Sequence, residues 1–185
     1  GPAGRAQVVS LDWDGPARMT TPAHRRLLRD FKKVTMDAPE GISAAPVGDD
    51  LFKWTAVMFG PAGSPWEGGV WKLAMKFPAE YPERPPAVRF LSDVFHPNVY
   101  KDGKICLDLL GSAWSPAYDV CTVLLGIQSL VASPDLHATP EGGANPDAEA
   151  LFVRDRQRYN AKIEALVAAQ LSEDDLEMGS LSAVP

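Results

Sequence analysis

The spacing of apolar residues changes along this chain from a helical period to an alternating one, and then back. Near the N-terminus, apolar residues recur every three or four positions between Leu27 and Val34. Thr21 can cap this segment and Pro22 suits a first helical turn, so we predict a helix that begins there. Its outward face carries a basic cluster: Arg25, Arg26, Arg29, Lys32 and Lys33.

Three strand-like segments occupy the middle of the chain. Apolar and polar residues alternate from Trp71 to Phe77, which is typical of a half-buried strand. Residues 51–59 are rich in β-forming side chains, and residues 87–91 are short and apolar. The connection before the third segment holds Tyr81-Pro82, where a cis peptide bond is possible. A helix, a strand meander and further helices in this order predict an α+β fold.

A central helix is predicted over residues 119–132. One stripe of apolar residues faces inward: Val120, Val123, Leu124, Ile127, Leu130 and Val131. At helical spacing, Leu125 lies about 150° from the centre of this stripe, and Ser129 is also on the outer side. An outward leucine is either an ordinary exposed residue or a docking point, and the pattern alone favours neither.

Two more helices are predicted towards the C-terminus, and the ends of the chain lack a clear pattern. Asn145-Pro146 opens the first of these helices as cap and first turn, and Ile163 to Val167 belongs to the second. We expect residues 172–185 to form a short, acidic, mobile tail. We expect residues 1–18 to be a vector-derived or disordered extension, with one domain over 19–171.

Composition narrows the choice of partners and compartment. The chain has 185 residues, 45% of them hydrophobic, which suits one domain with a sizeable core. The net charge of −6 argues against direct nucleic-acid binding, and no apolar run approaches the roughly 18 residues of a membrane span. Cys106 and Cys121 could pair, but we expect free thiols in a reducing compartment, the cytoplasm and nucleus.

The most informative segment runs from His96 to Pro116, HPNVYKDGKICLDLLGSAWSP. It places Cys106 eight residues after Asn98 and eight before Trp114. Cysteine chemistry needs an accessible thiolate, an oxyanion donor and a loop that holds both, and this segment offers a candidate for each. A lone cysteine is more often structural, which is our interpretation of Cys121 on the central helix.

These three pieces at this spacing resemble the active-site region of ubiquitin-conjugating enzymes. The resemblance covers residues 19–171 and implies their α+β fold: an N-terminal helix, a four-stranded antiparallel meander, an active-site loop, a central helix and two C-terminal helices. It implies that Cys106 accepts ubiquitin from the activating enzyme as a thioester, which a substrate lysine then attacks. No cofactor is expected, because ATP is used upstream by the activating enzyme. The implied partners are ubiquitin, the activating enzyme, RING-type ligases and protein substrates, with no membrane.

The resemblance also assigns roles around Cys106. Asn98 either stabilises the oxyanion or holds the loop, and the two roles are compatible. His96 buttresses the loop, Tyr100 packs beside the incoming lysine, and Asp108 supports the site. The acidic or serine gate residue of many relatives corresponds here to Asp135 or Glu141, in a longer loop over 133–143.

Two binding surfaces follow from the same resemblance. The donor ubiquitin would fold back on Leu125 and Ser129. Ligases would grip the first helix and two loops: Arg25, Arg29, Arg84, Ser115, Pro116 and Ala117. Several relatives have phenylalanine where Glu83 stands, so we expect a selective set of ligases. Residues 19–33 and 81–100 look like the branch that serves postreplication DNA repair, histone monoubiquitination and N-degron turnover.

Two other functions were weighed. An inactive variant that only presents ubiquitin typically lacks the cysteine, and Cys106 is present. A cysteine hydrolase needs a histidine paired with an acid or amide, and His24 and His137 fall in a helix and a loop without such a partner.

Overall fold

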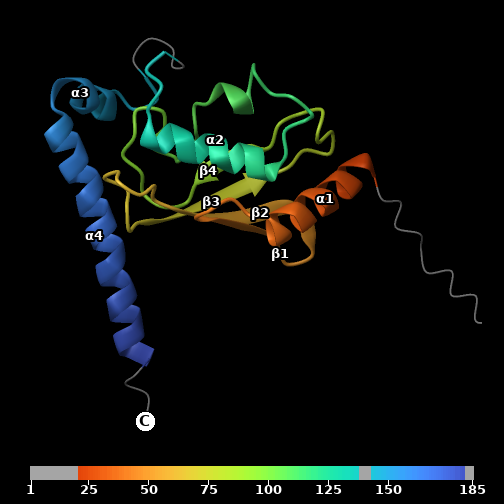
Figure 1. The fold of residues 1–185 in the computed structure, drawn as a ribbon, viewed down its shortest axis with the longest axis horizontal. Helices are drawn as coiled ribbons and strands as arrows, with labels where there is room; N and C mark the ends of the chain where they lie inside the picture. The colour runs from red at the N-terminus through yellow and green to blue at the C-terminus, as the bar shows by residue number, and fades with distance from the viewer. Residues whose placement is uncertain (1–20, 138–142, 182–185) are drawn as a thin grey trace, which may run out of the picture.

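A computed structural model describes residues 21–137 and 143–181, with side chains described as far as Gln170. Expectations for residues 1–18 and for Glu141 lie outside this part of the chain. The elements, in chain order, are α1 Pro22–Met36, β1 Ile42–Val47, β2 Asp50–Phe59, β3 Val70–Lys76, β4 Ala87–Phe90, the 3-10 turn η1 Asp108–Leu110, α2 Val120–Ala132, α3 Pro146–Arg154 and α4 Arg156–Leu181 (Figure 1).

The four strands form one antiparallel meander in the order β1-β2-β3-β4, which confirms the fold class. In β3, Trp71, Leu73 and Met75 are buried while Lys72 and Lys76 are exposed, as the alternation predicted. The apolar pattern did not predict β1, because its sequence ISAAPV is mostly small residues and contains a proline. Pairing with β2 makes it a strand.

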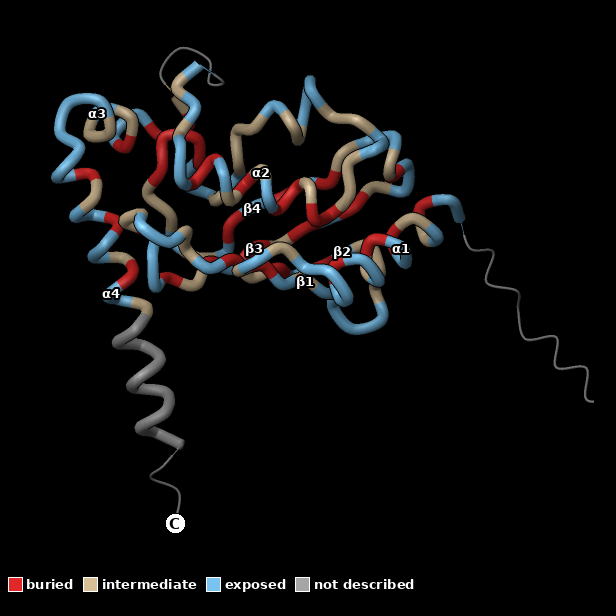
Figure 2. Tube along the Cα trace, in the orientation of Figure 1, coloured by how far each residue is buried: buried red, intermediate tan, exposed pale blue. Residues whose placement is uncertain are grey.

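The helix α2 buries one face in the core (Figure 2). Its buried residues are the predicted stripe together with Cys121. Leu125 is 45% exposed, so the predicted helical phase is confirmed. A group of large aromatic side chains in the strands and loops fills the core with it: Trp54, Trp66, Trp71 and Tyr81.

The predicted helix starts are also present. The hydroxyl oxygen of Thr21 accepts a bond from the amide of His24, and Asn145 caps α3 in the same way. The helix α4 continues to Leu181 and so enters the stretch for which a tail was predicted; the mobility of that tail stays a prediction. The Tyr81-Pro82 bond is cis. In the described part of the chain, no helix has the length and apolar character to span a membrane.

Candidate active site

A tight turn sets the shape of the loop that carries Cys106. Gly103 and Lys104 face Tyr100 through two backbone hydrogen bonds of 2.9 Å. Gly103 has a φ of +84°, and a Cβ there would lie 2.2 Å from the carbonyl oxygen of Phe90, so only glycine fits. The chain then returns, and the amide of Cys106 donates to the carbonyl of Asn98 at 2.8 Å.

His96 is fully buried beneath this loop. Its Nδ1 accepts from the amide of Asn98 at 3.0 Å, which leaves the proton on Nε2 to donate to the carbonyl of Leu130, also at 3.0 Å. Burial lowers the pKa of His96 to about 4, so the ring is neutral at neutral pH. Since both ring nitrogens are engaged with backbone groups, these contacts support a buttressing role and leave no nitrogen to act as a base.

The side chain of Asn98 ties the active-site loop to a second loop. Its Nδ2 donates to the carbonyl of Asp135 at 2.5 Å, and the amide of Asp135 donates to its Oδ1 at 3.0 Å. Asn98 is also fully buried. The contacts therefore support the loop-holding role, while the oxyanion role stays a prediction.

The thiol of Cys106 is half-buried among acidic groups. Burial raises its pKa, as do the negative charges of Asp108 and Asp135, while a hydrogen bond with Tyr100 opposes the shift. A pKa raised above the ordinary thiol value favours the protonated thiol at neutral pH, and the carboxylates suit the approach of a cationic lysine.

One residue of the site was missed in the sequence. A Cβ at Gly126 would lie 3.3 Å from Leu109 Cδ1 and 3.9 Å from Leu107 Cδ2. This glycine on α2 therefore lets the turn after Cys106 pack closely against the helix. A small residue within an otherwise apolar helix was the available signal.

Most of the residues predicted to bind partners are exposed: Pro116 and Ala117 are exposed, and Ser115 beside them is half-buried. Leu125 and Ser129 are both exposed on α2. Arg25, Arg29 and Arg84 are exposed on α1 and the 81–84 loop.

Within the described residues, no group of three or more histidine, cysteine, aspartate or glutamate side chains could hold a metal ion.

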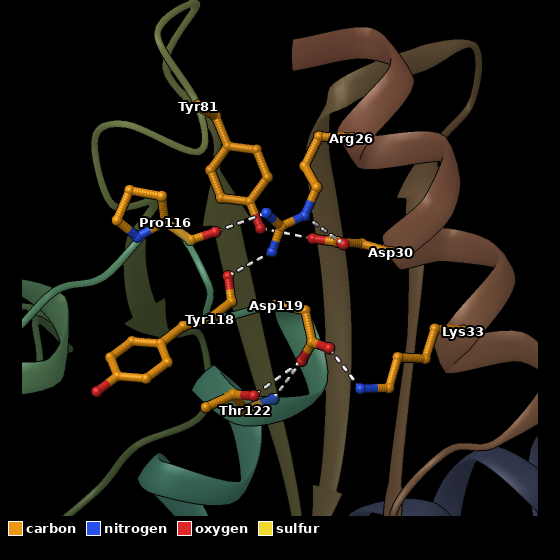
Figure 3. A network of polar contacts seen from close by, with 8 residues as sticks. All are labelled: Arg26, Asp30, Lys33, Tyr81, Pro116, Tyr118, Asp119 and Thr122. Carbon is orange, nitrogen blue, oxygen red and sulfur yellow. Dashed lines mark hydrogen bonds and ion pairs between the residues drawn. The ribbon is translucent and has the colours of Figure 1, made fainter. Parts of the chain in front are cut away.

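Arg26, to which the sequence had assigned no function, connects two of the segments predicted to bind ligases. The guanidinium of Arg26 donates to the carbonyl oxygens of Pro116 and Tyr118 at 2.6 and 2.7 Å (Figure 3). The sequence showed Arg26 only as one of five basic residues in the cluster, because its acceptors are backbone atoms about ninety positions away.

Comparison with known proteins agrees with this geometry. Residues 26–167 match the family model described as ubiquitin-conjugating enzyme. The chain is 48% identical over 149 residues to "Ubiquitin-conjugating enzyme E2 3" of Arabidopsis thaliana, an alignment that covers 80% of this chain and 97% of that protein. It is also 48% identical over 149 residues to "Ubiquitin-conjugating enzyme E2 1" of Caenorhabditis elegans, covering 80% of this chain and 76% of that protein. The chain belongs to the ubiquitin-conjugating enzyme family, transferases that carry ubiquitin as a cysteine thioester.

Proposed function

We propose that Cys106 is the residue that carries ubiquitin. The observation that supports this most directly is the contrast between the two thiols. Cys106 is partly accessible at the end of the loop buttressed by His96, whereas Cys121 is buried in α2 at 5% exposure. Incubation with ubiquitin, activating enzyme and ATP should give a reductant-sensitive adduct on Cys106. The same assay with other small modifiers tests whether ubiquitin is preferred.

The acceptor lysine is proposed to enter between Tyr100 and the acidic groups beside Cys106. A lysine ammonium has a reference pKa of about 10.4 and must lose its proton before attack. Tyr100 would shield it from water, which lowers its pKa, and the nearby carboxylates would attract it. Asp135 fits the gate because Asn98 fixes its backbone and its charge acts on the thiol. Asp135→Ala should slow single-turnover discharge onto lysine while charging persists.

The ligase partners and the cellular branch are proposed from the sequence segments that carry them. RING-type ligases would bind the exposed arginines of α1 and the loops at 83–84 and 115–117. The branch would be that of postreplication DNA repair, histone monoubiquitination and N-degron turnover, in the cytoplasm and nucleus. Discharge onto nucleosomes with a RING ligase of that branch, beside one of another branch, tests this assignment. Equal stimulation by both ligases would remove it.

A further inference from the structure

A polar network joins three parts of the chain that are distant in sequence (Figure 3). Arg26 Nε donates to Asp30 Oδ1 at 2.9 Å within α1. The hydroxyl of Tyr81, which precedes the 82–84 loop, donates to Asp30 Oδ2 at 2.5 Å. Burial and the adjacent Asp30 raise the pKa of Tyr81, so its hydroxyl keeps the proton that it donates.

The third part of the chain is the 115–118 loop. The two Nη atoms of Arg26 donate to the carbonyls of Pro116 and Tyr118, while its Nε remains on Asp30. This loop is also tied to the second part, because the indole of Trp114 donates to the carbonyl of Pro82 at 2.8 Å. The planar guanidinium thus serves three acceptors at once, which a single ammonium on a lysine stem cannot reproduce.

These three parts are the same three segments proposed above to bind ligases. We propose that Arg26 is a positioning residue that presets the ligase-binding surface, by holding the 115–118 loop against α1 in the conformation a RING domain recognises. The proposal rests on the proposed ligase surface and adds to it a residue that is itself largely covered, its side chain being 15% exposed.

Other contacts hold the fold near Arg26, so the loss of Arg26 should change the 115–118 loop and not the core. The start of α2 is held independently, because Asp119 caps it through Thr122 and pairs with Lys33 at 2.5 Å. The loop that Arg26 holds is largely on the surface, where Pro116 and Ala117 are exposed. Without Arg26, water can satisfy these carbonyls, so the loop would lose its fixed conformation while the core keeps its packing.

Arg26→Lys is the informative variant, since it keeps a positive charge beside the buried Asp30 and so protects the fold. We would measure single-turnover discharge of the charged enzyme against the concentration of a RING domain that stimulates the wild-type protein. The concentration for half-maximal stimulation should rise about tenfold, which corresponds to about 1.4 kcal/mol of binding free energy. The maximal rate at saturating RING domain should stay within about twofold of wild type, because ligase binding itself restores the loop.

Lys32→Met is the matched control, because it removes a charge from an exposed position of the same helix. It should leave the half-maximal concentration unchanged. Amide chemical shifts of residues 115–118, recorded without ligase, should move in Arg26→Lys and not in Lys32→Met. Wild-type half-maximal stimulation in Arg26→Lys would overturn the proposal, as would a maximal rate that falls as much as the affinity. Failure of the wild-type protein to form an adduct on Cys106 would instead contradict the proposed function, and the loop shifts would still test Arg26.

Discussion

Asn98 and Asp135 hold each other through a reciprocal pair of hydrogen bonds between one side-chain amide and one backbone unit. The pair closes the active-site loop onto the loop that follows α2. The amide that the family resemblance would aim at an oxyanion is therefore already bound to a carbonyl before any substrate arrives.

Asn98→Ala should destabilise the protein. It removes both bonds at a buried site, at a cost of about 2 kcal/mol and a drop in melting temperature of roughly 4–8 °C. Asn98→Asp replaces the donor that faces the Asp135 carbonyl with a buried carboxylate oxygen, so it should destabilise the protein at least as much in the same melts. Unchanged melting together with discharge slowed roughly 10²-fold would contradict the loop-holding role and support the oxyanion role.

Cys106→Ser should form a reductant-stable oxyester in place of the thioester, because a hydroxyl is a weaker nucleophile and an ester a slower acyl donor. Gel analysis with and without reductant distinguishes the two adducts. Cys121→Ser is the matched control and should charge normally. If the Cys121 variant alone lost charging while remaining folded, the thioester would have to be assigned to Cys121 and not to Cys106.

The alkylation rate of Cys106 should keep rising with pH beyond the ordinary thiol range, whose pKa is about 8.5. The reason is that burial, Asp108 and Asp135 all raise the pKa of this thiol. Rates of iodoacetamide alkylation, measured against pH in a Cys121→Ser background, give the pH midpoint for Cys106. Asp108→Asn should lower that midpoint, whereas Asp93→Asn, a charge that does not act on the thiol, should not. An unchanged midpoint in Asp108→Asn would assign the shift to burial and Asp135.

Leu125→Arg should impair ligase-stimulated discharge with little change in melting temperature. Leu125 is 45% exposed on α2, so a long charged side chain can stay solvated there. Leu124→Arg is the matched control one residue away, and it should unfold the domain because Leu124 is fully buried. Wild-type discharge in a stable Leu125→Arg protein would return this leucine to an ordinary exposed residue.

The free energy of unfolding should fall as the pH decreases from the pKa of His96 in the unfolded chain towards its pKa in the folded protein. The pKa of this ring is about 4 in the folded protein, against about 6.5 when unfolded, so the unfolded state binds the proton more readily. The contribution is fully present above about pH 6.5 and is lost progressively towards pH 4, by about 3 kcal/mol in all. Urea unfolding at several pH values measures the slope, and His96→Gln should flatten it. An equal slope in the variant would assign the acid sensitivity to other groups.

The sequence by itself determined the elements whose signal is local. The start of α1 at Thr21 and Pro22, the alternation in β3 and the helical phase that exposes Leu125 follow from capping and periodicity, which involve residues only a few positions apart. The spacing of Asn98, Cys106 and Trp114 likewise indicated the active-site loop, because the motif that resembles the family lies within one short segment.

The tertiary structure decided what depends on distant partners. The strand β1 has little local signal and exists through its ladder with β2. Asn98 bonds a backbone 37 positions away, and Arg26 bonds a carbonyl 90 positions away. A backbone carbonyl is chemically the same at every residue. The sequence therefore cannot show which carbonyl a given side chain will bond. Only the packing of α1, the sheet and α2 brings those groups within hydrogen-bond distance.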